Sequence, residues 1–296
     1  MAKKKKTYLE QYVDELRNRK QMAVDRFGNL TTLENDILNS SFDWLVENLE
    51  IKNNTFQVSD DLTALMNKFV NVTLEIINQN ESYQNKLSDY LRDLKTLSKN
   101  IITFQSDFNK IDVAREIKPV QATMTQELID RLTDNGLNAN FVQPLRDVIY
   151  NNAVAGMNLR QARQYLTDFV TSGKDKSGRL KSYIEQTATI GVDAFEGAIN
   201  TKIQAQFATT GLIISGSLID TSSEQCVQAV EDSKQTNGYL PNSYWETLIE
   251  KYKDAKRAPV IEGTTIDNLP VNKLHWGCRH SFTPVIKKTS NEEQIQ

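Results

Sequence analysis

The sequence predicts a mainly α-helical protein, in which a long helical hairpin or bundle at the N-terminus precedes a small α+β module. The first observation behind this prediction is where the chain breakers lie. All six prolines follow residue 118, and Gly28 is the only glycine before Gly136. Since proline and glycine interrupt regular structure most strongly, the first 118 residues should form a few long helices. The second observation is an apolar repeat in the same region.

This repeat has the heptad spacing of helices that pack side by side. Apolar residues recur in alternating steps of four and three at Tyr83, Leu87, Tyr90, Leu94, Leu97, Ile101, Phe104, Phe108 and Ile111. An upstream series consists of Leu62, Leu65, Phe69, Val72 and Ile76. The two series join through a slip at Gln79 and Asn80 that resembles a stutter, so we expect one helix from about residue 60 to 111. Its apolar seam serves either an intramolecular core, which we favour, or a partner surface.

The remaining N-terminal residues have the signals of shorter helices that fold back on the long one. Ser59 is placed to cap the long helix, and Asn53 and Asn54 suggest a turn before it. Residues 7–49 are amphipathic, with a break at Phe27-Gly28-Asn29. A helical hairpin or small bundle is therefore expected.

Beyond residue 118 prolines and glycines become frequent, which predicts shorter helices and strands. The expected helices are 125–135, closed by Gly136; 141–154; 158–170, with Asn158 as N-cap; and 180–209, ended by Gly211. A turn at 173–178 precedes the last helix, and a strand at 212–219 follows it. These changes divide the chain into a helical arm (1–118), a helical connector (119–178), an α+β module (179–287) and a polar tail (288–296).

The charge balance excludes one class of nucleic-acid binder. A formal net charge of -3 and a pI near 5.6 are incompatible with affinity from a large excess of Lys and Arg, so any contact with DNA must be local. The one basic cluster is Lys3, Lys4, Lys5 and Lys6, either a solvated tail or a contact with DNA or an acidic partner. No stretch has the length and apolarity of a membrane span or a signal peptide, so we expect synthesis in the cytoplasm and no stable membrane insertion.

The residues with the most specific chemistry lie near the C-terminus. His275-Trp276-Gly277-Cys278-Arg279-His280 contains both histidines of the protein and one of its two cysteines. With Cys226 upstream, the set Cys226, His275, Cys278 and His280 supplies the four soft ligands of a closed tetrahedral zinc site. Two alternatives stay open: the histidines form hydrogen bonds inside a small β-rich subdomain, or the two cysteines form a disulfide.

Familiar enzyme signatures are missing from the sequence. It contains no Walker-type loop, no dinucleotide-binding fingerprint and no His-Glu-x-x-His motif. A catalytic cysteine–histidine pair is conceivable, but no glycine-rich loop or oxyanion hole accompanies it. The acidic segment at Asp220 is better explained as a helix cap, with Asp220 or Thr221 capping the helix that carries Cys226.

The order of these features resembles the phage Mu protein F-like head morphogenesis family. Residues 186–200 resemble the family's helix, Asp220 to Cys226 its first ligand-like region, and 269–285 its tail, where His275, Cys278, Arg279, Pro284 and Val285 match. The resemblance covers about a third of the chain, and only the tail motif is sharp. Two positions depart from the family pattern, because Ser223 and His280 stand where members often carry cysteine.

The resemblance implies a minor structural protein of a tailed phage or prophage. Such a protein would be made in the host cytoplasm, bind the portal protein or the major capsid protein, and act in the virion in head assembly or genome delivery. Asp220, Arg279 and Pro284 would be structural residues of the module, and Arg279 would hold carbonyls or a carboxylate. The alternatives are a zinc- or thiol-dependent hydrolase or toxin-like module, and an ejected internal protein that binds packaged DNA.

Overall fold

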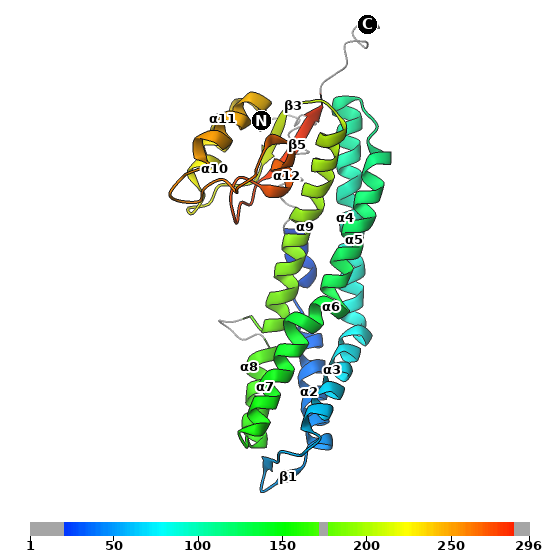
Figure 1. Cartoon of the computed structure of the whole chain (residues 1–296). Coiled ribbons are helices and arrows are strands. Elements are labelled where there is room, and N and C mark those ends of the chain that lie inside the picture. The colour runs from blue at the N-terminus through cyan, green and yellow to red at the C-terminus, as the bar shows by residue number, and fades with distance from the viewer. Residues whose placement is uncertain (1–20, 172–176, 287–296) are drawn as a thin grey trace, which may run out of the picture. The chain divides into compact units, whose positions relative to one another are not determined.

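The computed structural model describes residues 21–171 and 177–286, and the protein is mainly α-helical, as predicted (Figure 1). Lys3 to Lys6, the turn expected at 173–178 for the most part and the polar tail from 288 lie outside the described residues. The chain forms two compact units, each assembled from segments distant in sequence. One unit comprises 22–92 and 126–190, and the other, among the described residues, comprises Gln21, 93–125 and 191–286. The domain boundaries drawn from the sequence stay predictions.

The first unit is built around a ring of four helices. Their bounds are Thr31–Asn48 (α2), Leu62–Gln79 (α3), Gln143–Val154 (α7) and Leu159–Val170 (α8). Helix α2 contacts α3 and α8, and α7 contacts α3 and α8 (Figure 1). The expected break after Phe27 is confirmed, because residues 21–27 are helical and α2 begins at Thr31. The expected turn is also present: Asn53 and Asn54 have positive φ and join the two-residue strands β1 (Ile51–Lys52) and β2 (Thr55–Phe56).

The prediction of one helix from about residue 60 to 111 is wrong. Helix α3 ends at Gln79, and helix α4 runs separately from Glu81 to Asn109. Asn80 ends one helix and caps the next, because its Oδ1 accepts a hydrogen bond from the Tyr83 amide at 2.8 Å. Its Nδ2 donates to Asp36 at 2.7 Å. The slip in the heptad pattern thus marks a helix boundary rather than a stutter.

Most of the apolar seam of α4 is buried within the chain, whereas Phe108 near its end is 37% exposed. Tyr83, Tyr90, Leu94, Ile101 and Phe104 are fully buried, which supports the intramolecular core. In α3 the buried residues differ from the predicted series: they are Leu62, Met66, Phe69, Val70, Thr73 and Ile77. The predicted cap is also wrong, because α3 begins at Leu62 and Asp61, rather than Ser59, occupies the cap position without a side-chain hydrogen bond.

The helices after α4 follow the expected order with shifted ends. Helix α5 spans Ala114–Leu132 and contains Pro119, whereas a start near residue 125 was expected. Gly136 does not close a helix, because it lies inside the short helix α6, Asp134–Leu137. A π-helical segment, Asn138–Val142, leads into α7. Asn158 caps α8 as predicted: its Oδ1 accepts from the Gln161 amide, and the Gln161 side chain accepts from the Asn158 amide.

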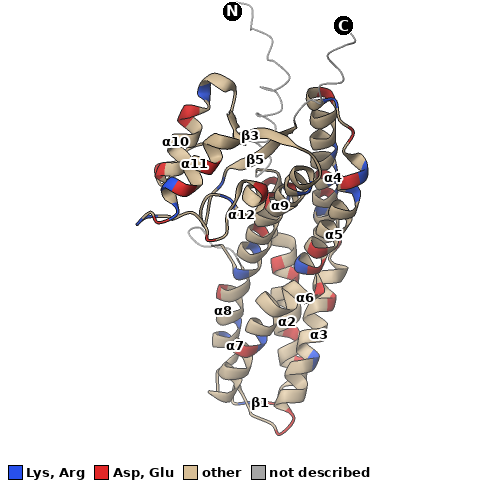
Figure 2. Ribbon diagram, turned by 45° about the horizontal axis from the view of Figure 1, so that its top comes forward, with Lys and Arg blue, Asp and Glu red and all other residues tan. Residues whose placement is uncertain are grey.

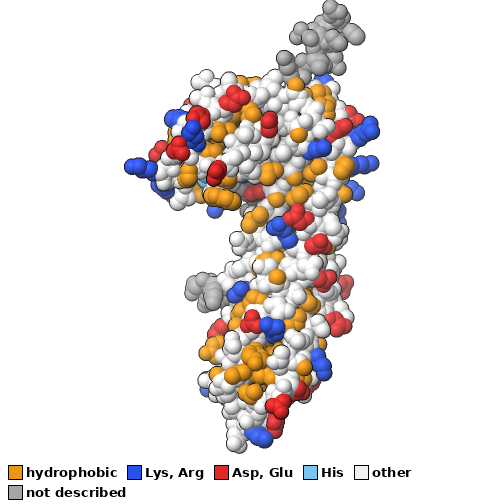
Figure 3. All heavy atoms as spheres, viewed as in Figure 1, with side chains coloured by type: hydrophobic (Ala, Val, Ile, Leu, Met, Phe, Trp, Pro, Cys, Tyr) orange, Lys and Arg blue, Asp and Glu red, His pale blue; other side chains and the backbone are white. Residues whose placement is uncertain are grey.

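Charged residues of both signs are interspersed along the helices, and hydrophobic side chains gather on part of the face over α7 and its neighbours (Figures 2 and 3). Val154 in α7 and Tyr165 in α8 are each 50% exposed. No helix among the described residues has the length and apolarity needed to cross a membrane.

The second unit contains a three-stranded antiparallel sheet in the order β4-β3-β5. The strands are Thr209–Ser215 (β3), Tyr239–Pro241 (β4) and Ser281–Ile286 (β5). Helix α9, Arg179–Gln206, precedes β3 and contributes residues to both units. The prediction that Gly211 ends this helix is wrong, because Gly211 lies in β3 opposite Pro241. The predicted strand starts earlier than expected and stops at Ser215 instead of residue 219.

Short helices pack on this sheet around Trp245. They are Glu224–Asp232 (α10), Asn242–Tyr252 (α11) and Leu269–Asn272 (α12). The fully buried Trp245 indole lies edge-on to Phe282 at 5.4 Å between ring centroids and donates to the Leu240 carbonyl at 3.1 Å. Cys226 and Cys278 belong to the same buried cluster, so the cysteines are part of the module's core.

Polar side chains fix the last strand within this unit. Gln105 of α4 donates to the Pro284 carbonyl at 3.0 Å, and the Ile286 amide donates to Asn109 at 3.2 Å. On the α9 side, the Ser281 hydroxyl donates to the buried Glu196 carboxylate at 3.0 Å. Because buried polar groups need partners, these bonds set the register of β5 and hence the position of the loop before it.

Candidate metal centre

The four predicted ligands come from two segments of the second unit. Cys226 lies in the first turn of α10, whereas His275, Cys278 and His280 lie in the loop between α12 and β5. Cys226, Cys278 and His280 are buried, and His275 is partly exposed. The contact between α10 and the loop brings together residues about 50 positions apart in the sequence.

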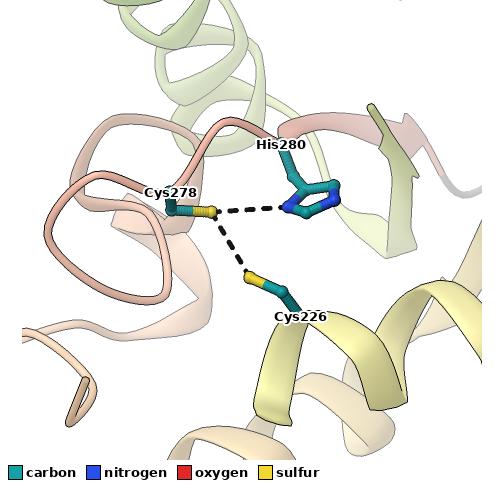
Figure 4. Close-up of side chains that lie close together, drawn as sticks. All are labelled: Cys226, Cys278 and His280. Carbon is teal, nitrogen blue, oxygen red and sulfur yellow. Dashed lines mark hydrogen bonds between the residues drawn. The ribbon is translucent and has the colours of Figure 1, made fainter. Parts of the chain in front are cut away.

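Three of these side chains converge on one point (Figure 4). The Sγ atoms of Cys226 and Cys278 lie 3.7 Å apart, and Cys278 Sγ lies 3.7 Å from His280 Nδ1. The ligand atoms of Cys226, Cys278 and His280 all lie within 4.8 Å of one another, so this buried group could hold a metal ion. The cysteines are free thiols, and the alternative of a disulfide is not formed in this structure.

His275 approaches the same group from the loop. Its Nε2 lies 3.2 Å from Cys226 Sγ, while its Nδ1 lies 2.9 Å from the Trp276 carbonyl oxygen. Because a carbonyl only accepts, this contact places the proton on Nδ1 and leaves a lone pair on Nε2 toward the thiol. Metal-binding histidines commonly use their second nitrogen in this way.

Two glycines permit the backbone of this site. Gly277 has φ +78° and lies inside a turn that the Cys278 amide closes on the His275 carbonyl at 3.1 Å. Positive φ at this position is typical of a type II turn and favours glycine. Gly216 has φ +133°, and a Cβ there would approach His280 Cδ2 to 2.9 Å. Gly216 therefore leaves the room that the His280 ring occupies.

The pKa values of the two thiols are shifted in opposite directions. Hydrogen bonding from Cys226 holds the pKa of Cys278 well below its usual range, and His275 and His280 act in the same direction. The pKa of Cys226 is raised, first by its hydrogen bond with Cys278 and second by burial. The pKa of His275 is raised mainly by its hydrogen bond with Cys278. In the absence of a metal, these directions favour Cys278 as the thiolate and Cys226 as its hydrogen-bond donor.

Three of the donors have the spacing of a tetrahedral site, whereas His275 does not belong to the group whose ligand atoms all lie within 4.8 Å of one another. With Zn–S bonds of about 2.3 Å and Zn–N bonds of about 2.0–2.1 Å, a tetrahedron has edges of roughly 3.8 Å between sulfurs and roughly 3.6 Å between sulfur and nitrogen. The two 3.7 Å distances match these edges, and the 3.2 Å distance from Cys226 to His275 is slightly shorter. Two thiolates would neutralise a divalent ion, which reduces the cost of burying the charges.

The other residues singled out in the sequence have different surroundings. Asp220 does not cap α10, which begins at Glu224 after Ser223. The reason is a tight turn, in which Ser222 Oγ accepts from the Ile219 amide at 2.8 Å and the Ser222 amide donates back to the Ile219 carbonyl. Arg279 is exposed. Pro284 is buried in β5, opposite Leu212.

Several residues that shape this region were not singled out in the sequence. Gly216 and the Gln105–Pro284 contact depend on tertiary packing, and no local pattern marks them. The turn glycine Gly277 and the exposed Trp276 lie inside the motif, where they give a local signal.

Comparisons with protein-family models, with curated proteins and with solved structures gave no match to this chain.

Proposed function

We propose that this chain is a minor head protein of a tailed phage or prophage, and that its C-terminal module is held together by one zinc ion. The observation that supports the proposal best is the convergence of Cys226 with Cys278 and His280. The tail motif around His275 gives the resemblance to the Mu protein F-like family, and the distant Cys226 lies against that motif.

Zinc fits these donors better than the other common divalent ions. Thiolate and imidazole are soft ligands, whereas magnesium and calcium prefer oxygen. His280 stands where family members often carry cysteine, and it retains a side chain that can bind zinc. We therefore assign Cys226, His275, Cys278 and His280 as the ligands.

A structural role follows when His275 supplies the fourth ligand beside Cys226, Cys278 and His280. Structural zinc sites use four protein ligands, whereas catalytic sites use three and leave the fourth position to water or substrate. The ion would join α10 to the loop before β5 and so stabilise the core around Trp245. With four protein ligands, a zinc-dependent hydrolase would lack an open position for its substrate.

In this proposal the helical part docks on the portal protein or the major capsid protein, and the chain resides in the virion head. The experiment starts with the DNA that flanks the gene, where portal and terminase genes are expected. Particles are then purified from the induced host, and their proteins are identified by mass spectrometry. We expect the chain in the particles at few copies per portal. Particles that assemble and package DNA normally without the chain would contradict the proposal.

The zinc assignment is separable from the phage assignment. A gene deletion complemented with the Cys278→Ser variant should give fewer filled heads than complementation with the parent gene. Trp276→Phe is the matched control, because Trp276 lies in the same loop but offers no ligand. Equal numbers of filled heads with Cys278→Ser would show that the metal is not needed for assembly, even if the chain is a head protein.

A further inference from the structure

A cavity of about 280 Å³ opens beside the Cys/His group. Its wall consists of the segment before α10, the start of α10, the loop at Arg257 and Ala258, and the loop from His275 to His280. All of these residues belong to the second unit. The proposed zinc site uses one wall of this cavity and leaves the rest of it without a role.

The cavity favours an anion. Arg257 and Arg279 line it, and both are exposed. Among the described residues that line the cavity there is no aspartate or glutamate. A Cys₂His₂ zinc group is neutral, so the arginines would set the sign of the local charge. Arginine binds phosphate through several N–H donors at once, which suits it to this ligand.

Polar groups on the cavity wall add to the preference for an anion. Ser223 and Cys226, at the start of α10, both line the cavity, and Ser223 does not cap the helix with its side chain. The positive end of the α10 dipole therefore lies at the cavity, with the exposed Glu224 carboxylate in the same first turn.

Trp276 adds an aromatic surface to the rim. Its side chain is 84% exposed, the highest value among the large hydrophobic residues that are exposed in the described part of the chain. It lies between His275 and Gly277 and also lines the cavity. An exposed indole beside arginines is the arrangement on which single-stranded nucleic acids stack their bases, because every base has a π face.

We propose that this cavity binds one nucleotide of a single-stranded nucleic acid, with the phosphate at Arg257 and Arg279 and the base on Trp276. The binding is local, so the chain's net charge of -3 does not oppose it. The inference rests on the proposed zinc site, and it needs neither the phage assignment nor DNA contact by the N-terminal lysines.

The test is a fluorescence titration of the full-length, zinc-supplemented protein at low salt. A dye-labelled oligothymidylate of about eight nucleotides reports binding by anisotropy, and the protein's tryptophan emission reports stacking. Arg257→Gln and Arg279→Gln should each weaken binding about tenfold and lower its salt dependence. Trp276→Ala should also weaken binding about tenfold and remove the quenching of tryptophan emission. All three side chains are exposed, so these variants should fold, which circular dichroism verifies.

Matched controls separate the cavity from general charge effects. Lys256→Gln removes an exposed cation next to Arg257 that does not line the cavity, and it should leave affinity nearly unchanged. Linear polyphosphate and thymidine supply the phosphate and the base alone, and each should bind at least about tenfold more weakly than the oligonucleotide. Polyphosphate binding as tight as oligonucleotide binding, an unchanged affinity of Trp276→Ala, or equal losses in Lys256→Gln and Arg257→Gln would each overturn the proposal.

Discussion

The Sγ atom of Cys226 lies 3.7 Å from the Sγ atom of Cys278, although 52 positions separate the two residues in the sequence. This distance is too long for a disulfide of about 2.05 Å and suits two ligands of one metal ion. The pair connects α10 to the loop before β5, and both cysteines belong to the core that contains Trp245. The chemistry of the pair therefore affects the stability of the module as well as its site.

The unequal acidities of the two thiols predict one thiolate in the reduced, metal-free protein. Because the pKa of Cys278 is lowered and that of Cys226 is raised, absorbance near 240 nm should show about one thiolate below the ordinary thiol pKa of 9.0. Cys226→Ala removes the main cause of the lowered pKa and should move the titration to higher pH. An unchanged titration in this variant would contradict the assignment of Cys226 as the donor.

The same shift has a consequence for stability. The pKa of Cys278 is lower in the folded than in the unfolded chain, so its thiolate stabilises the metal-free fold fully above the unfolded pKa. This contribution is lost as the pH falls through the lowered, folded pKa. Thermal unfolding of the Cys278→Ser variant should accordingly depend less on pH, as the pH falls below the ordinary thiol pKa of 9.0, than unfolding of the parent.

Gly277→Ala tests whether the turn positions the ligands. Alanine at φ +78° should cost about 1–2 kcal/mol and shift His275 relative to Cys278, which should weaken zinc binding by at least about tenfold. Gly263 is a matched control, since it also has φ +78° and a Cβ added at either glycine would meet no atom within 4 Å. Gly263→Ala should lose similar stability and keep its zinc affinity. Equal zinc affinities in the two variants would show that the turn does not position the ligands.

Asn80→Ala tests the boundary between α3 and α4. The substitution removes the cap on Tyr83 and the hydrogen bond to Asp36, so the free energy of unfolding should fall by about 1–2 kcal/mol. Urea denaturation measures the loss. Gln79→Ala changes the preceding, exposed residue and should cost less than about 0.5 kcal/mol. Similar losses in both variants would mean that the Asn80 side chain does not stabilise the boundary through its cap and its bond to Asp36.

The sequence predicted the helical class because proline and glycine are distributed so unevenly, and it predicted the break after Phe27 and the Asn158 cap from local signals. It did not predict the end of α3 at Gln79. The slip in the heptad pattern was visible, but its outcome depends partly on Asp36, which lies 44 positions away and binds Asn80. Gly211 was misplaced for a related reason, since its pairing with Pro241 in β4 is a tertiary contact.

The candidate ligands were predictable because the chain contains so few cysteines and histidines. Their convergence was a hypothesis, since it requires α10 to pack against a loop about 50 residues further along. The Asp220 cap failed because Ser222 forms a turn with Ile219 that delays the start of α10. The cavity beside the site was not anticipated, because Arg257 reaches it from a separate loop.

Metal content tests the central claim most directly. Protein purified without chelator and without added metal should contain close to one zinc per chain by elemental mass spectrometry, and Trp276→Phe should retain it. Cys226→Ser and Cys278→Ser should each contain little or none, because each removes a thiolate ligand. A zinc content near zero in the parent protein, unchanged after refolding with excess zinc, would contradict the account.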